Sequence, residues 1–237
     1  MKSNLVPNVM AVAEPPIERT AHLRVTLLFV LVLVLNVADC GSPHAPSAFT
    51  ASPALPEAEL KDLYTGTLLK QLSFRDIDGP GLLLLSRSEQ TVPAQDDEQP
   101  MDQITLRAEL FRRTDEARPW SSRWSVEDPV QCKGLDLDAG YFLDQVTATD
   151  LDNDGRAELT LASHSSCGGG VDPQQLRIGL RQGEQYYEVR GESLVQVEGD
   201  EPFGGERQND PALASAAAPL RSHLDNVWEA IKRGSSP

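Results

Sequence analysis

The sequence predicts a mainly β domain: an antiparallel meander or sandwich-like sheet of about seven or eight short strands, with a C-terminal helix that caps it. Two patterns support this fold class. From residue 68 to residue 192, short segments alternate polar and apolar side chains between turn-forming residues; in "QITLRAELFRR" one face carries Ile104, Leu106, Ala108 and Leu110. Near the C-terminus the apolar residues recur at helical spacing instead, at Leu220, Leu224, Val227, Trp228 and Ile231.

The elements follow one another with short connections. "AELKDLY" (58–64) predicts a short helix or an irregular turn, and the polar segment "EQTVPAQDDEQPMD" (89–102) predicts a long loop. Pro219 suits the first turn of the C-terminal helix, which we expect to bury Trp228 in the core. Strands are expected at 68–76, 82–88, 103–113, 120–128, 144–150, 157–163, 174–182 and 185–192, the last two forming a hairpin.

Bulk composition restricts the function. The chain has 237 residues, of which 40% are hydrophobic but only 5% aromatic, so the core must be mainly aliphatic. The net charge is -15 and the pI is about 4.6. A surface this acidic repels nucleic acids and anionic lipid headgroups and attracts cations, so we do not expect a nucleic-acid partner.

The N-terminal region predicts export. Residues 25–37 form an almost unbroken apolar run that follows Arg19 and Arg24, and this length is typical of a signal peptide and short for a membrane span. Cys40 follows at once, and "VADC" resembles the lipobox of bacterial lipoproteins, in which the Cys becomes the lipidated N-terminus. Asp39 departs from that pattern, so ordinary signal-peptide cleavage or an uncleaved anchor remain alternatives. The start of translation is either Met1 or Met10.

These signals divide the chain into four parts. We expect a signal peptide at 1–39, a lipidated Cys40 with a Pro-, Ser- and Ala-rich tether at 40–57, a β-rich domain at 58–205, and a linker with the amphipathic helix at 206–237. The protein would then be a membrane-anchored lipoprotein that faces the periplasm or the cell surface. Gly41 after the lipidated Cys slightly favours the outer membrane.

Cysteine usage fits an oxidising compartment. If Cys40 carries the lipid, Cys132 and Cys167 remain and favour a disulfide, which would stabilise the fold by roughly 3–4 kcal/mol in the chain-entropy model. The alternative is that Cys167 is a nucleophile assisted by His164. Side chains three apart on a strand point to opposite faces, which disfavours that pair.

The segment "TDLDNDGRAE" carries the strongest chemical signal. Carboxylates at alternate positions can converge on one cation if the chain curls, and Gly155 permits the curl. The sequence therefore predicts a Ca²⁺ site, with a solvated Asx-type turn as the alternative. The expected ligands are the side chains of Asp150, Asp152, Asp154 and Glu158 and the carbonyl of Arg156. An earlier segment, "FRDIDGPGLLLLS" (74–86), echoes the same strand–Asp–Gly–strand pattern, either through duplication or because such turns suit hairpins.

Two resemblances extend this interpretation. The acidic loop resembles the calcium loops of FG-GAP and VCBS-type β-repeats, although Glu158 replaces the usual Asp and the repeat occurs essentially once, so no propeller is expected. Residues 124–192 resemble an uncharacterised bacterial envelope family that shares a Trp-to-Cys strand, a TDLDNDG-like loop and a second Cys. That resemblance supports the pairing of Cys132 with Cys167 and supplies no catalytic residues.

The function expected from the sequence is therefore that of a non-catalytic envelope lipoprotein, a binding or structural module with an envelope protein or a glycan as its partner. No common catalytic motif occurs in the sequence. Some members of the resembled family carry a label of surface polysaccharide biosynthesis. The alternative is thus an enzyme or accessory factor that acts on surface polysaccharides.

Overall fold

The structure is a computed structural model that describes residues 49–93, 100–133, 135–168 and 171–234. The expected signal peptide, the expected lipidation site Cys40 and the tether up to residue 48 lie outside these residues. Within the described residues, no helix has the length and apolar character needed to cross a membrane.

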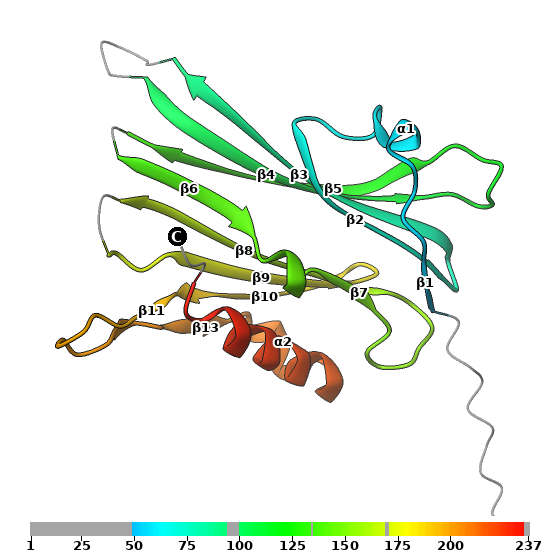
Figure 1. The fold of residues 1–237 in the computed structure, drawn as a ribbon. Helices are drawn as coiled ribbons and strands as arrows, with labels where there is room; N and C mark the ends of the chain where they lie inside the picture. Colours follow the sequence, from blue (N-terminus) through cyan, green and yellow to red (C-terminus); the bar gives the residue numbers. More distant parts are fainter. Residues whose placement is uncertain (1–48, 94–99, 134, 169–170, 235–237) are drawn as a thin grey trace, which may run out of the picture. The chain divides into compact units, whose positions relative to one another are not determined.

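The predicted mainly β, antiparallel fold with a C-terminal helix is confirmed, in two large sheets (Figure 1). The first sheet is a meander in chain order: β1 (Thr50–Ser52), β2 (Thr67–Asp76), β3 (Gly79–Val92), β4 (Met101–Arg112) and β5 (Ser121–Cys132). The second sheet has the order β13 (Arg207–Asn209), β10 (Gln185–Glu192), β9 (Gln175–Gln182), β8 (Glu158–Gly168) and β6 (Asp136–Tyr141), and β8 also pairs with β7 (Thr147–Thr149).

The remaining elements are short, except for the C-terminal helix. A two-stranded ribbon joins β11 (Leu194–Val195) to β12 (Phe203–Gly204). The helical segments are α1 (Glu57–Leu60), the 3₁₀ turns η1 (Leu143–Gln145) and η2 (Pro211–Ser215), and α2 (Ala218–Ile231).

The first sheet is covered on both faces, which explains the continuous run of four leucines in β3. Successive side chains of a strand point to opposite faces. Leu82 and Leu84 therefore pack on the outer face with Leu60 of α1, whereas Leu83 and Leu85 pack on the inner face against residues of the second sheet. A strand buried on both sides has an uninterrupted apolar sequence rather than an alternating one.

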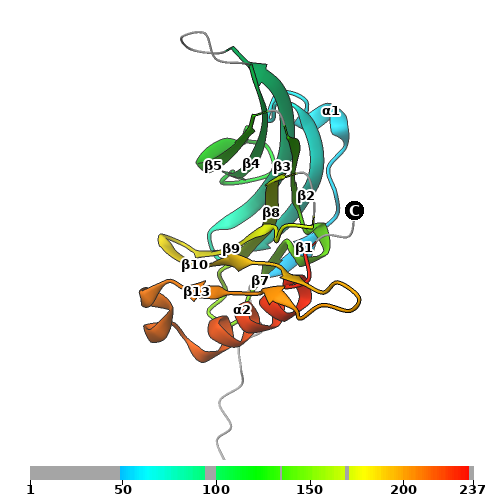
Figure 2. The same cartoon turned by 90° about the vertical axis from the view of Figure 1, so that its left-hand side faces the viewer.

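The second sheet lies between the first sheet and α2. On β8, Leu159 packs towards the first sheet, whereas Ala162 packs towards the helix. Figure 2 shows α2 lying along β9, β10 and β13. The five apolar residues predicted for the buried helix face are all buried in this layer, including Trp228 at 4% exposure: Leu220, Leu224, Val227, Trp228 and Ile231.

Five short strands were not predicted, and one predicted loop is too long. β1 lies inside the predicted tether, and β11, β12 and β13 lie beyond the last predicted strand, where β13 pairs with β10. β6 does alternate, with Leu137, Ala139 and Tyr141 on its apolar face, and this pattern was overlooked. Residues 89–92 and 101–102 of the predicted loop continue β3 and β4 as a paired hairpin. β1, β13 and these extensions of β3 and β4 are mostly polar, so backbone pairing with a neighbouring strand determines their structure rather than their own side-chain pattern.

The predicted disulfide is confirmed and joins the two sheets. Cys132 ends β5, Cys167 lies in β8, and their sulfurs are 2.02 Å apart with Cα atoms 5.4 Å apart. The alternative in which Cys167 is a free nucleophile is therefore wrong. Arg177 of β9 adds a second connection between the sheets, because its Nη1 bonds Asp128 of β5 at 3.1 Å.

The docking of α2 predicts a pH dependence. His223 of α2 lies 2.9 Å from Thr160 Oγ1 through its Nε2, and burial lowers the pKa of His223 below its usual 6.5. Below pH 6.5 this site then binds more protons in the unfolded chain than in the folded chain. His223 therefore contributes a fall in stability as the pH drops from 6.5 through its lower folded pKa. Replacing His223→Gln should flatten this fall, measured as the free energy of urea unfolding at pH 5 and pH 7.5. The same pH dependence in variant and parent would contradict the assignment.

Candidate metal centre

The acidic loop connects β7 to β8 and folds into a tight curl. Its flanking residues Thr149 and Glu158 pair across the two strands, so residues 150–157 must reverse the chain within a short span. Asn153 and Gly155 do this with positive φ angles of 59° and 83°. Asn and Gly are the residues that adopt this left-handed conformation most readily, which is why the sequence "NDG" can form the curl.

The curl brings four carboxylates together. Each of Asp150, Asp152, Asp154 and Glu158 contributes one oxygen atom, and these oxygens all lie within 4.8 Å of one another. The predicted side-chain ligands therefore converge, from a loop and from the first residue of the following strand. Glu158 is fully buried, whereas Asp154 is exposed, so the cluster runs from the protein interior to solvent.

Backbone amides of the loop hold the aspartates in place. The N–H of Gly155 donates to Asp150 Oδ2 at 3.1 Å, and the N–H of Arg156 donates to Asp154 Oδ1 at 2.7 Å. The N–H of Leu151 donates to Glu158 Oε2 at 2.5 Å. The bond between Arg156 and Asp154 is the Asx-type bond that the alternative interpretation predicts. All three bonds hold the carboxylates of the cluster in place.

A residue outside the motif completes the arrangement. The side-chain amide of Gln182, in β9, donates to both Asp152 Oδ2 at 2.7 Å and Glu158 Oε1 at 3.0 Å. Gln182 pairs directly with Glu158 across β8 and β9. Sequence analysis missed this residue, because only the register between the two strands places it beside the loop.

Burial and neighbouring negative charges raise the pKa of Glu158. Its carboxyl is removed from water, and the charges of Asp152, Asp150 and Asp154 add to the effect, against the hydrogen bond from Leu151; together they raise the pKa of Glu158 to about 7. A buried carboxylate beside three others is costly unless a proton or a cation compensates for the charge. Near neutral pH, either a proton on Glu158 or a bound cation can compensate for this charge.

The earlier Asp–Gly turn packs directly against the acidic loop. Asp76 Oδ2 accepts the N–H of Ala157 at 3.0 Å, and Gly155 O accepts the N–H of Ile77 at 2.9 Å. Arg156 reaches Asp78 through Nη1 at 2.6 Å. The two segments that echo each other in the sequence therefore lie side by side, and one supports the other.

A buried ion pair between Arg112 and Asp76 holds Asp76 in place against the acidic loop. Arg112 bonds both oxygens of Asp76 at 2.7 Å, and the Asp76 side chain has no exposed surface. Burial by itself raises the pKa of Asp76, but the Arg112 bonds, the amides of Ala157 and Asp78 and the Arg112 charge outweigh it and lower the pKa. The Asp76 carboxylate is therefore charged at neutral pH and holds the loop from the first sheet.

The donor set fits a hard divalent cation. Ca²⁺ binds carboxylate oxygens at about 2.3–2.6 Å, so ligands on opposite sides of one ion are about 5 Å apart. The span of 4.8 Å between the cluster oxygens agrees with that diameter. The cluster could thus hold a metal ion. Of the predicted ligands, the carbonyl of Arg156 stays a prediction, and the Arg156 side chain turns to Asp78 instead.

His164 is nearly buried and packs between neighbouring side chains. It lies in β8, with 9% of its side chain exposed, 3.3 Å from Asp138 through Nδ1 and 5.0 Å from the Phe142 ring centroid. Gly140 faces the same ring closely, because a Cβ added there would lie 2.9 Å from His164 Nε2. The imidazole therefore fills the space beside a glycine of the paired strand β6.

Comparisons of the chain with protein-family models, with curated proteins and with solved structures find no significant match. The resemblance of the acidic loop and of residues 124–192 to known families therefore stays a prediction from the sequence.

Glu158 provides a direct test of the electrostatics in metal-free protein. The folded pKa of Glu158, about 7, lies above the unfolded value of 4.5, so between these values Glu158 binds more protons in the folded state. Glu158 therefore contributes a fall in stability as the pH rises. Above pH 7 this contribution lowers the free energy of unfolding by about 3 kcal/mol, relative to its value below pH 4.5. Replacing Glu158→Gln should remove this fall, measured as the free energy of unfolding in EDTA at pH 5 and pH 8.

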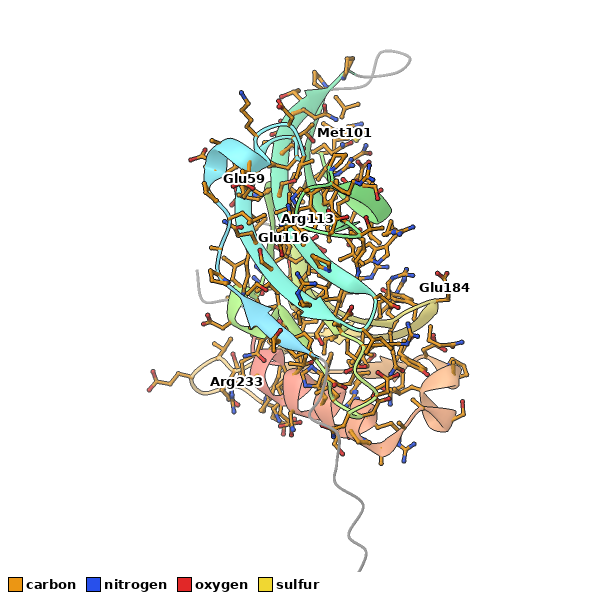
Figure 3. The ribbon with its side chains drawn as sticks, turned by 90° about the vertical axis from the view of Figure 1, so that its right-hand side faces the viewer. Glu59, Met101, Arg113, Glu116, Glu184 and Arg233 are labelled. Carbon is orange, nitrogen blue, oxygen red and sulfur yellow. A yellow bond between two sulfur atoms is a disulfide. The ribbon has the colours of Figure 1, made fainter. Side chains whose placement is uncertain are left out.

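The matched control is Glu59→Gln. Glu59, labelled in Figure 3, is an exposed carboxylate of α1, which packs on the outer face of the first sheet. It should leave the pH dependence as it is in the parent. If Glu158→Gln retained the parent's pH dependence, the buried carboxylate would not be the group that titrates.

Proposed function

We propose that this protein is an exported, lipid-anchored and non-catalytic envelope protein whose β domain is stabilised by one calcium ion at the acidic cluster. The observation that carries the proposal is the convergence of Asp150, Asp152, Asp154 and Glu158 within 4.8 Å, with Glu158 fully buried. A divalent cation would relieve the repulsion among these carboxylates and the cost of burying one of them.

The ion would have a structural role and no catalytic one. The loop lies between β7 and β8 and is attached to the first sheet through Asp76, so a cation there would fix the loop and both sheets at one end. Extracellular calcium sites of moderate affinity, with Kd of about 10⁻⁴–10⁻³ M, serve this purpose in exported modules. The domain so stabilised would present its surface to an envelope protein or a glycan.

Other features support the exported location. The apolar run at 25–37 and the Cys at position 40 are a lipoprotein-like leader, and the Cys132–Cys167 disulfide suits an oxidising compartment. An acidic surface with a net charge of -15 repels anionic lipids, which favours an anchor over direct adsorption to a membrane.

The test is a thermal melting curve followed by circular dichroism, with EDTA, with 10 mM Mg²⁺ and with 10 mM Ca²⁺. If Kd is about 0.1 mM, saturation with Ca²⁺ should add about 2.7 kcal/mol, which corresponds to an increase in Tm of about 5–10 °C. The effect of Mg²⁺ should be smaller, because Mg²⁺ requires shorter bonds of about 2.0–2.1 Å and retains its own water molecules.

Two variants make the melting test specific. Asp152→Asn removes one cluster charge while keeping the side-chain shape, and it should abolish most of the shift caused by calcium. Asp62→Asn, an exposed carboxylate beyond α1, should leave the shift unchanged. Equal melting temperatures in Ca²⁺ and EDTA for the parent protein would refute the calcium proposal.

A further inference from the structure

A cleft opens between β5, the edge strand of the first sheet, and the hairpin of β9 and β10 in the second sheet. Figure 2 shows these three strands on the same side of the molecule. The wide part of the cleft has a volume of about 170 Å³, and its narrow end has about 30 Å³. Both parts share the wall residues Leu106, Asp128, Ser163 and Arg177, so they form one continuous space.

Strand register places the polar wall of the cleft on one face of the second sheet. Three residues of β10 pair directly with three of β9: Tyr186 with Arg181, Glu188 with Gly179, and Arg190 with Arg177. Leu159 of β8 pairs with Arg181 and packs against the first sheet, so these side chains share the face that looks towards β5. A Cβ added at Gly179 would lie 2.7 Å from Tyr186 Oη, so the glycine makes room for the tyrosine ring on this face.

The guanidinium of Arg181 lies in the narrow end between two aromatic rings. It is 5.0 Å from the ring centroid of Trp124 in β5 and 5.3 Å from that of Tyr186 in β10. Among the described residues no carboxylate forms an ion pair with Arg181, although the chain has a net charge of -15. Stacking holds a guanidinium by its faces and leaves its N–H groups, which lie in its plane, able to donate. Arg181 is partly exposed, so an anion from solvent can reach these donors.

Polar side chains that solvent also reaches surround the wide part. Asp128 and Arg177 bond each other at 3.1 Å, and their side chains remain 38% and 32% exposed. Arg190 is 63% exposed and bonds Glu188 through Nε, and its other two nitrogens have no partner among the described residues. Gln175 is exposed and donates to a carboxylate of β10 at 3.1 Å. The wide part therefore offers both acceptors and donors to a ligand that carries hydroxyl groups.

The sizes of the two parts indicate the class of ligand. Since a water-sized group needs about 10–15 Å³ of free space, the narrow end admits roughly two or three atoms and the wide part roughly a dozen. A carboxylate has three atoms and forms charge-assisted hydrogen bonds with a guanidinium. A sugar ring with its hydroxyls has about the size of the wide part. Its apolar C–H groups can contact Leu106 and Val130, which line the same part.

We propose that this cleft binds an acidic saccharide, with the carboxylate of a uronic acid at Arg181 and the sugar hydroxyls at Asp128, Gln175 and Arg190. The inference rests on the proposed function in one respect, because it names the chemical class of the glycan partner and its site. Calcium takes no part in it. The melting test of the calcium site and the binding test of the cleft can therefore fail separately.

The test follows the indole N–H of Trp124 by two-dimensional NMR of the ¹⁵N-labelled full-length protein, in a nonionic detergent without a sugar headgroup. The chain has three Trp residues, and Trp124→Phe identifies the signal that matters. Methyl glucuronide is titrated at constant ionic strength and should shift this signal to saturation with a Kd of about 1 mM or lower.

Three further ligands separate the contributions of ring and charge. Methyl glucoside has the same ring with a hydroxymethyl group in place of the carboxylate, and acetate has the carboxylate without the ring. Each should bind at least about tenfold more weakly than methyl glucuronide, because each satisfies only one part of the cleft. N-acetylglutamate methylamide represents an acidic peptide and should also bind at least about tenfold more weakly.

Variants connect the response to the cleft. Arg181→Gln should weaken binding of methyl glucuronide by about tenfold or more and leave the weak binding of methyl glucoside as it is in the parent. Arg118→Gln, an exposed arginine between β4 and β5 outside the cleft wall, should bind both ligands like the parent. If Arg181→Gln fails to fold, Arg190→Gln at an exposed side chain should weaken both ligands by about tenfold.

Several results would overturn the proposal. A Trp124 response to methyl glucuronide that never saturates would mean that the cleft holds solvent only. Equal binding of methyl glucoside would remove the role of the carboxylate, and equal binding of acetate would remove that of the ring. Binding of the glutamate derivative as tight as that of methyl glucuronide would identify an acidic peptide site instead. Unchanged affinity in both arginine variants would contradict the assigned contacts.

Discussion

The buried carboxylate of Asp76 is the interaction on which the two sheets and the acidic loop depend together. It sits where β2 turns into β3, accepts two hydrogen bonds from Arg112 of β4, and accepts the N–H of Ala157 from the loop before β8. Strand pairing in the first sheet places Arg112 beside Asp76, and packing of the two sheets places Ala157 there. Removing this charge would leave Arg112 buried without its counter-charge, which is the costly way to break a buried pair.

Two other connections act at different places along the sheets. The disulfide joins β5 to β8 at the end of β4 that carries Asp102, while Asp76 and Arg112 act at the opposite end of the same strand. Arg177 and Asp128 connect the sheets between them. The covalent bond and the ion pairs thus hold the apolar layer, in which Leu83, Leu85 and Leu159 pack, at both ends and in the middle.

The sequence predicted the features that depend on local periodicity. The structure contains the alternating strand β4, the hairpin of β9 and β10 and the apolar face of α2. These were predictable because the spacing of apolar residues indicates which face of an element is buried. The convergence of the four acidic side chains was also predicted, since a short loop constrains them to meet.

Features that depend on long-range pairing were missed. β1 and β13 are short and polar, and only a neighbouring strand makes them extended. Gln182 lies beside the acidic cluster through the register of β8 with β9, and the role of Asp76 depends on how the sheets pack. The similarity between residues 74–86 and the acidic loop was a signal for Asp76, but sequence similarity of two turns does not say that they touch.

Asp76 in the first sheet orders the acidic loop of the second. Amide hydrogen exchange of an Asp76→Asn variant, residue by residue, tests it most directly, because exchange separates local opening from global unfolding. In this variant the Ala157 and Gly155 amides should lose protection by a larger factor than the amide of Ile178, a residue of β9 that packs under α2. Loop amides that keep their protection, or lose it only by the same factor as β9, would contradict it.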